Sequence, residues 1–284
     1  MKGLASIVVG LDFSECSRVA LAHALRVASW AGAQVHPVHV VDAPIDEVRE
    51  DATLTELQRG IQAGLVMDAR KRWDTFVEGA TEASGLHLDV CVAHRVVGIR
   101  QQLDRHSADL LVLGAYGDEK PSVGMGTLAS TCVRSVPTDV LIVRDNYRDP
   151  FRTVVAGIDF SATSRRALEM AAVIAHGEGA RLYAAHIVPD RAETYARLRT
   201  ELGPELDAFV NETTCRYPGL EVHAKVFPYS GYRSGLLEFA ALVNGDLVAL
   251  GTRGRSNLRD LVLGSTAEKV IRDSVCAVLA AKPR

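Results

Sequence analysis

The sequence lacks the features that would tie the chain to a membrane or to an oxidising compartment. No apolar run approaches the roughly eighteen uninterrupted residues that a transmembrane helix needs. The start of the chain lacks the long apolar core of a signal peptide and leads directly into a strand pattern. The five cysteines are widely spaced and form no C-x2-C pair, which excludes the usual zinc and dithiol motifs. We therefore expect a cytoplasmic protein with reduced thiols.

An excess of charge of one sign is also missing. Lysine and arginine together number 32 and aspartate and glutamate 35, so the formal net charge is −3. This balance gives no electrostatic reason to expect binding to nucleic acid or to an anionic membrane. A length of 284 residues with 48% hydrophobic side chains is enough for two globular domains, each with its own core.

What the chain does contain is a glycine-rich stretch from Asp246 to Val270, with the sequence DLVALGTRGRSNLRDLVLGSTAEKV. Its first apolar run predicts a buried parallel strand, and its last residues predict a helix. Gly251, Gly254 and Gly264 lie between them with the spacing G-x2-G-x9-G-[ST]. Because glycine has no Cβ, such a loop lets the backbone approach a ligand, and the following helix amino terminus favours an anion. The same glycines are also compatible with a structural turn that needs tight packing.

This spacing differs from those of two common nucleotide-binding loops. No lysine follows the second glycine, as the G-x4-G-K-[ST] loop requires. The pattern is also not the dinucleotide fingerprint G-x-G-x-x-G. Ser265 and Thr266 follow the last glycine, and their hydroxyls can either cap the helix or contact phosphate oxygens.

Strand and helix patterns alternate along the first half of the chain. Apolar and β-branched runs predict strands at residues 6–11, 34–41, 90–97, 110–113 and 140–143. Helical spacing of apolar residues predicts a helix that follows a cap at Ser14 or Ser17, and others near 54–83, 99–105 and 128–134. This alternation predicts an α/β fold with a parallel sheet covered on both faces, and ligands at the carboxyl ends of the strands.

The pattern then begins again, which indicates a tandem duplication. Residues 10–21, GLDFSECSRVAL, match residues 157–168, GIDFSATSRRAL, at eight of twelve positions with an offset of 147. Residues 109–117, DLLVLGAYG, match residues 246–254, DLVALGTRG, and Gly126-Thr127 matches Gly264-Ser265. The unit is a whole βα domain, because a solenoid would have a much shorter period. The boundary is expected in the polar segment 145–150.

With both copies in view, the glycine spacing and the S-T-A-E-K-V helix resemble the ATP-binding signature of the universal stress protein family. The resemblance covers nearly the whole chain. It implies two doubly wound domains, residues 1–147 and 148–284, each with a five-stranded parallel sheet of order 3-2-1-4-5 and helices on both faces. Family dimers commonly pair through their last strands. Strands 140–143 and 278–281 are therefore expected to meet in an intramolecular pseudo-dimer, and a homodimer of such chains stays open.

The resemblance also implies ATP and Mg²⁺ as ligands, with an aspartate beside the ribose and phosphates or their metal. Asp159 in the second half and Asp12 in the first half lie at the matching positions, and Asp159 is the candidate metal ligand. A hard carboxylate oxygen suits Mg²⁺, which usually keeps several waters and bridges phosphates. The alternative is that each aspartate caps the helix that follows.

By the same resemblance, the backbone of Ile187 and Val40 would contact the adenine edge. Each follows a histidine, His186 or His39, near the end of a predicted strand. The histidines are expected to line the pocket or to pack, because no second ligand lies at the short spacings of zinc motifs.

The second half carries the intact phosphate loop, formed by Gly251, Gly254, Gly264, Ser265 and Thr266. Arg255 and Arg253 lie inside this loop and can add charge-assisted contacts to phosphates. For Arg253 the expectation is instead a side chain that points to solvent.

The first half departs from this pattern. Gly114, Gly117, Gly126 and Thr127 are present, but the loop is one residue shorter and reads DEKP after Gly117. Two carboxylates near a triphosphate are repulsive unless a metal intervenes. The second half is therefore expected to be the better nucleotide site.

Three functions remain in view. The first is an ATP-binding regulatory protein of stress response or signalling, whose conformation or partners change with nucleotide occupancy. The second is an enzyme, against which the chain lacks the S-G-G-x-D-S, G-x-S-x-G and H-E-x-x-H patterns, although slow Mg-dependent ATP hydrolysis stays open. The third is a nucleotide-free scaffold that acts through protein partners. We expect the first function, and no catalytic residue.

Overall fold

The computed structural model describes residues 3–42, 52–78, 80–117, 125–146, 149–190, 192–230, 235–253 and 263–283. Within these residues, strands and helices alternate and then repeat, as the duplication predicts. The elements of the first half are β1 (Ser6–Gly10), α1 (Glu15–Ala31), β2 (Gln34–Val41), α2 (Ala52–Phe76), the short 3₁₀ helix η1 (Thr81–Ala83), β3 (Asp89–Val92), α3 (Arg95–Arg105), β4 (Leu110–Gly114), α4 (Thr127–Ser135) and β5 (Asp139–Val143). Those of the second half are β6 (Thr153–Gly157), α5 (Ala162–Glu178), β7 (Arg181–Val188), α6 (Ala192–Thr214), β8 (Val222–Pro228), α7 (Gly235–Leu242), β9 (Leu247–Gly251), α8 (Ser265–Asp273) and β10 (Ala277–Ala281).

All ten of these strands form one sheet in the order β3-β2-β1-β4-β5-β10-β9-β6-β7-β8. The order 3-2-1-4-5 expected for each domain is therefore confirmed for the first half, and the second half shows it from the other edge inwards. Pairing is parallel within each half. Where the halves meet, β5 and β10 pair antiparallel, with Leu141 opposite Leu279. The last strands of the two copies thus meet as the resemblance implied.

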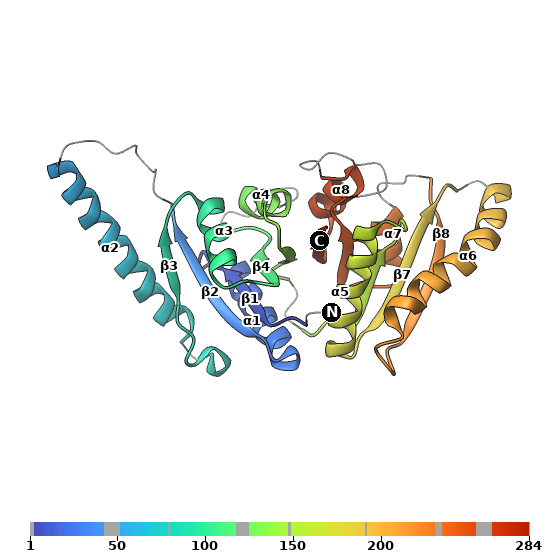
Figure 1. Ribbon diagram of the computed structural model, residues 1–284, viewed down its shortest axis with the longest axis horizontal. Coiled ribbons are helices and arrows are strands. Elements are labelled where there is room, and N and C mark those ends of the chain that lie inside the picture. Colours follow the sequence, from blue (N-terminus) through green and yellow to red (C-terminus); the bar gives the residue numbers. More distant parts are fainter. Residues whose placement is uncertain are drawn as a thin grey trace.

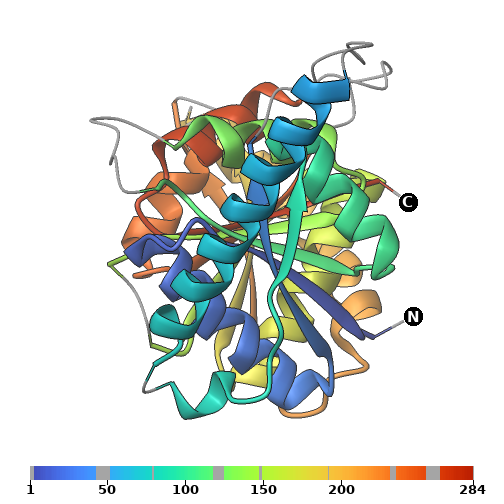
Figure 2. The same cartoon turned by 90° about the vertical axis from the view of Figure 1, so that its left-hand side faces the viewer.

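Helices cover both faces of this sheet. Strand residues that point to one face pack with α1, α2, α5 and α6, and those that point to the other face pack with α3, α4, α7 and α8. Each of these two cores runs across the junction between the halves. Figure 1 shows the halves side by side, with α2 and α6 at the two outer ends of the molecule. Figure 2, seen from the side of α2, shows the strong twist of the strands behind it.

The helix contacts at the junction join residues that differ between the two copies. The ring of Trp30 on α1 lies against Gly177 on α5, where an added Cβ would be 2.3 Å from the ring atom Cδ2. These two positions correspond in the duplication, because they are 147 residues apart. On the same pair of helices, Trp30 Nε1 donates to Glu178 Oε1 at 3.3 Å. The junction therefore places the bulkiest side chain opposite the smallest residue.

Two of the ion pairs that link the halves differ sharply in exposure. Arg166 on α5 contacts Asp139 on β5 at 2.8 Å, with side chains only 10% and 2% exposed. Arg134 on α4 contacts Glu268 on α8, also at 2.8 Å, but these side chains are about half exposed, at 52% and 48%. The first pair is buried within the junction, and the second lies on its surface.

Two predicted boundaries were wrong. The strand predicted at 90–97 ends at Val92, and α3 begins at Arg95. The apolar residues Val96 and Val97 belong to the first turn of α3, which Gly98 lets approach the sheet. A Cβ on Gly98 would lie 2.7 Å from Val40 Cγ1. The helix predicted at 54–83 ends earlier, at Phe76, and a 3₁₀ turn follows.

The cysteine side chains and the hydropathy of the helices were also points of the sequence analysis. All five cysteines are free thiols. In the described parts of the chain, we find no helix with both the length and the hydropathy needed to cross a bilayer.

Candidate nucleotide site

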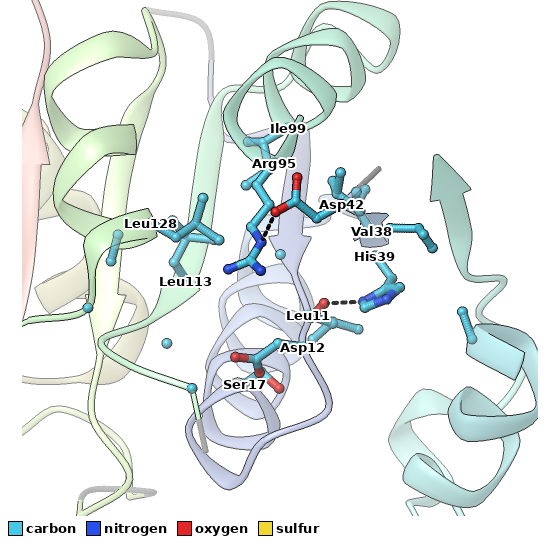
Figure 3. Close-up of a pocket in the computed structure, with 18 of the residues that line it drawn as sticks. Leu11, Asp12, Ser17, Val38, His39, Asp42, Arg95, Ile99, Leu113 and Leu128 are labelled. Carbon is cyan, nitrogen blue, oxygen red and sulfur yellow. Dashed lines mark hydrogen bonds and ion pairs between the residues drawn. The ribbon is translucent and has the colours of Figure 1, made fainter. Parts of the chain in front are cut away.

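A cavity of about 560 Å³ opens at the carboxyl ends of β1, β2 and β4 in the first half (Figure 3). This is the edge of a parallel sheet where ligands are expected. The cavity is lined by all six site residues that the sequence indicates for this half: Asp12, Val40, Gly114, Gly117, Gly126 and Thr127. Segments from four different elements or loops thus converge on one concave surface.

Asp12 begins a tight turn between β1 and α1. Its Oδ1 accepts hydrogen bonds from the Ser14 backbone N–H at 3.0 Å and from the Ser14 hydroxyl at 2.5 Å. Ser14 in turn is the N-cap of α1 and accepts from the Ser17 N–H. The alternative in which Asp12 caps this helix is therefore wrong. Ser14 is the cap, and Asp12 positions Ser14 by accepting its hydrogen bonds. Its second oxygen, Oδ2, faces Gly117 across the cavity floor.

The residue between the aspartate and the cap is held in a strained conformation. Phe13 has φ 67°, a left-handed value that is unusual for a bulky residue. Its ring packs against His39 with centroids 4.7 Å apart and against Phe76 edge-on at 5.6 Å. The Arg72 guanidinium lies 4.5 Å from the same ring centroid. These ring contacts offset the backbone strain and fix the direction of the neighbouring aspartate.

His39 is held in one tautomer by the backbone. Its Nδ1 lies 2.7 Å from Leu11 O, and since a carbonyl can only accept, Nδ1 carries the proton (Figure 3). Burial lowers the pKa of His39 below its ordinary 6.5, with the nearby Arg72 acting in the same direction. The imidazole is therefore neutral near pH 7, and Nε2 is left as a hydrogen-bond acceptor. His39 is a pocket-wall residue, as expected.

The second half repeats this turn. Asp159 Oδ1 accepts from the Ser161 N–H at 3.0 Å, and Ser161 is the N-cap of α5, so the capping alternative is wrong for Asp159 as well. Phe160 has φ 62°, and its ring packs on His186 at 4.9 Å. His186 Nδ1 lies 2.7 Å from Ile158 O. Ile187 follows His186 near the end of β7, as Val40 follows His39 on β2.

The first glycine of each loop serves packing within the protein. A Cβ on Gly251 would lie 2.8 Å from the Thr163 backbone carbonyl carbon, and one on Gly114 would lie 3.0 Å from that of Cys16. Each strand end thus passes close to the first turn of α1 or α5. The tight-packing interpretation therefore holds for these two glycines. Gly117 differs, because its Cβ would meet only the Asp12 carboxylate, at 2.7 Å from Oδ2.

The helices after the loops begin without a side-chain cap. Gly126 is the N-cap of α4 and Gly264 that of α8, and neither position supplies a side-chain hydrogen bond. Ser265 and Thr266 are exposed residues in the first turn of α8, so their hydroxyls do not cap this helix. The first N–H groups of α4, beside Thr127, border the cavity. A helix amino terminus of this kind favours an anion.

Known proteins resemble this chain along nearly its whole length. The universal stress protein family model matches residues 4–144 and again residues 150–282. The chain belongs to the universal stress protein family. Universal stress protein Rv1996 of Mycobacterium tuberculosis is 28% identical over 97% of this chain and 94% of its own. A solved universal stress protein of Archaeoglobus fulgidus covers 98% of both chains with 19% identity and a TM-score of 0.67. A universal stress protein solved in complex with cAMP covers 48% of this chain, with 23% identity and a TM-score of 0.41.

Sequence reasoning missed several residues that line the cavity of this universal stress protein. Arg95 contacts Asp42 at 3.0 Å on the cavity rim (Figure 3), and Asp68 and Arg72 reach it from α2. None belongs to the glycine motif. Asp42 directly follows a predicted strand, so its place at the carboxyl edge was a usable signal, whereas Arg95 lies inside the strand predicted at 90–97. Asp68 and Arg72 lie mid-helix, where the sequence holds no comparable signal.

Other predicted residues lie elsewhere. Gly254 and Arg255, and the acidic residues 118–119 of the first loop, are outside the described residues. Arg253 was expected to point to solvent, but it lines a second cavity at the junction of the halves. For metal binding, no cluster of three or more His, Cys, Asp or Glu side chains with suitable geometry occurs in the described ranges.

Proposed function

We propose that this universal stress protein binds ATP with Mg²⁺ in the cytoplasm and acts in stress response or signalling by changing its conformation or partners with nucleotide occupancy. The observation that carries the proposal is the convergence of six residues predicted from the sequence on one cavity beside a helix amino terminus without a side-chain cap. The cavity volume of about 560 Å³ is within the range of small-molecule sites. The two halves, residues 1–147 and 148–284, would each supply one site.

The groups at the cavity match the parts of a nucleotide. The backbone of Val40, at the end of β2, is available to an adenine edge, and the neutral Nε2 of His39 can accept a hydrogen bond. Gly117, Gly126 and the start of α4 would face the phosphates. The ion pair of Arg95 with Asp42 marks the open side of the cavity.

The residues present also fit a magnesium ion that arrives with the nucleotide. In the first half Asp12 Oδ1 is held by Ser14, which leaves Oδ2 for a metal–water shell. In the second half, Asp159 Oδ1 accepts from the Ser161 backbone N–H. Mg²⁺ in nucleotide sites commonly takes one or two carboxylates, with phosphates and water as its other ligands. A pre-formed protein cage is therefore not required.

The test is calorimetric titration of the full chain with Mg-ATP, after acid extraction of any nucleotide that co-purifies. Gly117→Val places methyl groups against the Asp12 carboxylate and is expected to weaken binding in the first half at least tenfold. Gly264→Val tests the second half at the position that matches Gly126, where φ −60° and ψ 141° are open to any residue. The second half is expected to bind more tightly, because the first loop carries two carboxylates.

Controls separate binding from folding. Gly251→Val is a poor probe, because its side chain would strike the Thr163 backbone and disturb the fold itself. Gly203→Ala on α6 has open space around its Cβ and should bind like the parent protein. Unchanged binding in folded Gly117→Val and Gly264→Val together would refute the phosphate cradles. The absence of any binding by the parent chain would favour the nucleotide-free scaffold.

We propose that the protein signals through nucleotide occupancy of its site and that its function does not require ATP hydrolysis. His39 is the imidazole at the cavity, and its Nδ1 is committed to Leu11 O. Asp12 is tied to the cap of α1 through one oxygen. The neutral Nε2 of His39 can accept a proton, so the rate of ADP release is the measurement that decides between occupancy and hydrolysis. Release of ADP at more than about one turnover per minute would contradict this proposal.

A further inference from the structure

A second cavity, here called the junction cavity, lies where the two halves meet. Its volume is about 230 Å³. The first half contributes Arg100 from α3 and residues 133–137 from the end of α4. The second half contributes Thr252 and Arg253 after β9, Leu263 before α8, and Lys282 and Pro283 after β10. The cavity exists only because the halves are joined, and it is separate from the nucleotide site of the first half.

The lining of the junction cavity is cationic. Four of its residues are basic, namely Arg100, Arg134, Arg253 and Lys282, and none of the described residues that line it is acidic. Lys282 is only 6% exposed. Burial, together with the nearby Arg253, lowers the pKa of this lysine to about 8 despite the opposing effect of Asp139. Burial thus disfavours the charged form of Lys282, and Asp139 offsets this effect only in part.

The partners of Lys282 and Arg134 leave room for a ligand. Lys282 Nζ donates to Val133 O, so two of its three N–H groups stay available as far as the described chain is concerned. Arg134 contacts Glu268, but both side chains are about half exposed, at 52% and 48%, and such pairs are weak. Asp139 holds the backbone N–H of Lys282 and the guanidinium of Arg166, and it does not line the cavity. The carboxyl terminus of α4 carries a partial negative charge, which disfavours a bound anion. Lys282 offsets this effect in part, because its Nζ donates a hydrogen bond to Val133 O in the last turn of α4.

We infer that the junction cavity binds a small phosphate anion, either inorganic phosphate or pyrophosphate, between the two halves. A doubly charged anion would favour the charged form of Lys282 and accept charge-assisted hydrogen bonds from basic side chains that line the cavity. The volume of about 230 Å³ is less than half that of the nucleotide cavity, which excludes a whole nucleotide.

The site would connect the junction to the second glycine loop. Arg253 and Thr252 come directly after Gly251, and Gly264 N–H donates to Thr252 O at 2.9 Å. The backbone carbonyl of Arg253 accepts from the Thr163 hydroxyl at the start of α5. A phosphate that engages the Arg253 side chain would therefore hold one end of the loop that is proposed to bind ATP.

The experiment is a titration of the full chain, labelled with ¹³C at the lysine ε-carbon, with inorganic phosphate and separately with pyrophosphate. The expected result is a saturable shift of the Lys282 signal and a rise in its apparent pKa. Arg100→Gln changes an exposed cation of the cavity rim and should weaken the affinity about threefold to tenfold. Lys225→Gln, an exposed cation on β8, is the matched control and should not change it. Comparison of the two titrations identifies which anion fits.

The design separates this site from the nucleotide site. Thr127→Val alters the proposed cradle of the first half and should leave the phosphate response of Lys282 unchanged. The inference is overturned if the Lys282 signal does not move at phosphate or pyrophosphate concentrations up to about 50 mM. It is also overturned if Arg100→Gln binds as tightly as the parent, since the anion would then lie elsewhere. Failure of ATP binding would not affect either result.

Discussion

At the scale of single residues, histidines make this protein sensitive to acid. The rings of His36 and His106 stack with centroids 3.9 Å apart, and His106 Nε2 contacts Asp89 at 2.8 Å. Burial first, and the neighbouring His106 second, lower the pKa of His36 below its ordinary 6.5, although Asp89 acts in the opposite direction. The folded state therefore binds this proton less readily than the unfolded state does.

From this shift we predict that stability falls as the pH drops below about 6.5. In that range the unfolded chain takes up more protons than the folded chain, so the free energy of unfolding decreases with decreasing pH. His39, whose pKa is also lowered, adds to the effect. His36→Phe keeps a stacking ring but removes the titrating group, so it should lose less stability between pH 7.5 and pH 5.5. Urea unfolding at both pH values measures this, and equal losses in parent and variant would contradict the assignment.

The sequence could indicate Asp12 and Asp159 as site residues, but not how they are held. Both lie in a D-F-S motif that also suits a helix cap, and only the geometry shows that the following serine is the cap. The left-handed conformation of Phe13 and Phe160 has no signal in a single sequence. It depends on ring contacts with a histidine 26 residues away in each copy, at His39 and His186.

At the scale of elements, the helix α3 is seated on the sheet through a glycine. Gly98→Ala would place a methyl group 2.7 Å from Val40 Cγ1 and 2.8 Å from Cys91 Sγ. We expect this overpacking to cost about 1–3 kcal/mol of unfolding free energy. The matched control is Gly64→Ala on the exposed side of α2, where no atom lies within 4 Å. There the loss of glycine should stabilise the protein by up to about 1 kcal/mol.

Chemical denaturation of the two glycine variants measures the difference. If both substitutions shift the denaturation midpoint in the same direction, the close contact between α3 and the sheet is not the reason for glycine at position 98. The position of α3 on the sheet also affects the candidate site, because Arg95 begins this helix and Ile99 lines the nucleotide cavity.

Element types were predictable from apolar periodicity, but one boundary was not. Residues Val96 and Val97 continue a β-branched run and read locally as strand. In the fold they begin α3, because Gly98 allows a helix to lie directly over β2 and β3. A contact between segments far apart in sequence thus overrides the local preference.

At the scale of the whole molecule, two of the ion pairs across the junction should differ greatly in their contribution to stability. Asp139→Asn removes a charge from a pair with Arg166 that is almost fully buried, and it should destabilise the protein by about 3–5 kcal/mol. Glu268→Gln breaks the half-exposed pair with Arg134 and should cost less than about 1 kcal/mol. Thermal unfolding of both variants at low and high salt provides the comparison. A larger loss for Glu268→Gln would show that the surface pair holds the halves together.

The duplication made the overall architecture predictable, since the second copy had to repeat the strand order of the first. The contacts across the junction were not predictable in the same way. Trp30 meets Gly177, although the two positions correspond, and Arg166 meets Asp139, whose counterparts are Val19 and Ala277. Internal similarity gives no information on contacts that depend on how the copies differ.

The pairing of β5 with β10 has a consequence for any fragment of the chain. All five residues of each strand are buried, and both strands are largely apolar. A cut between the halves that let them separate would expose two long hydrophobic edges, each with unpaired backbone donors and acceptors. Such edges are templates for aggregation. Proteolysis at the linker would then yield precipitate in place of two working domains, so loss of one half removes the other from solution as well.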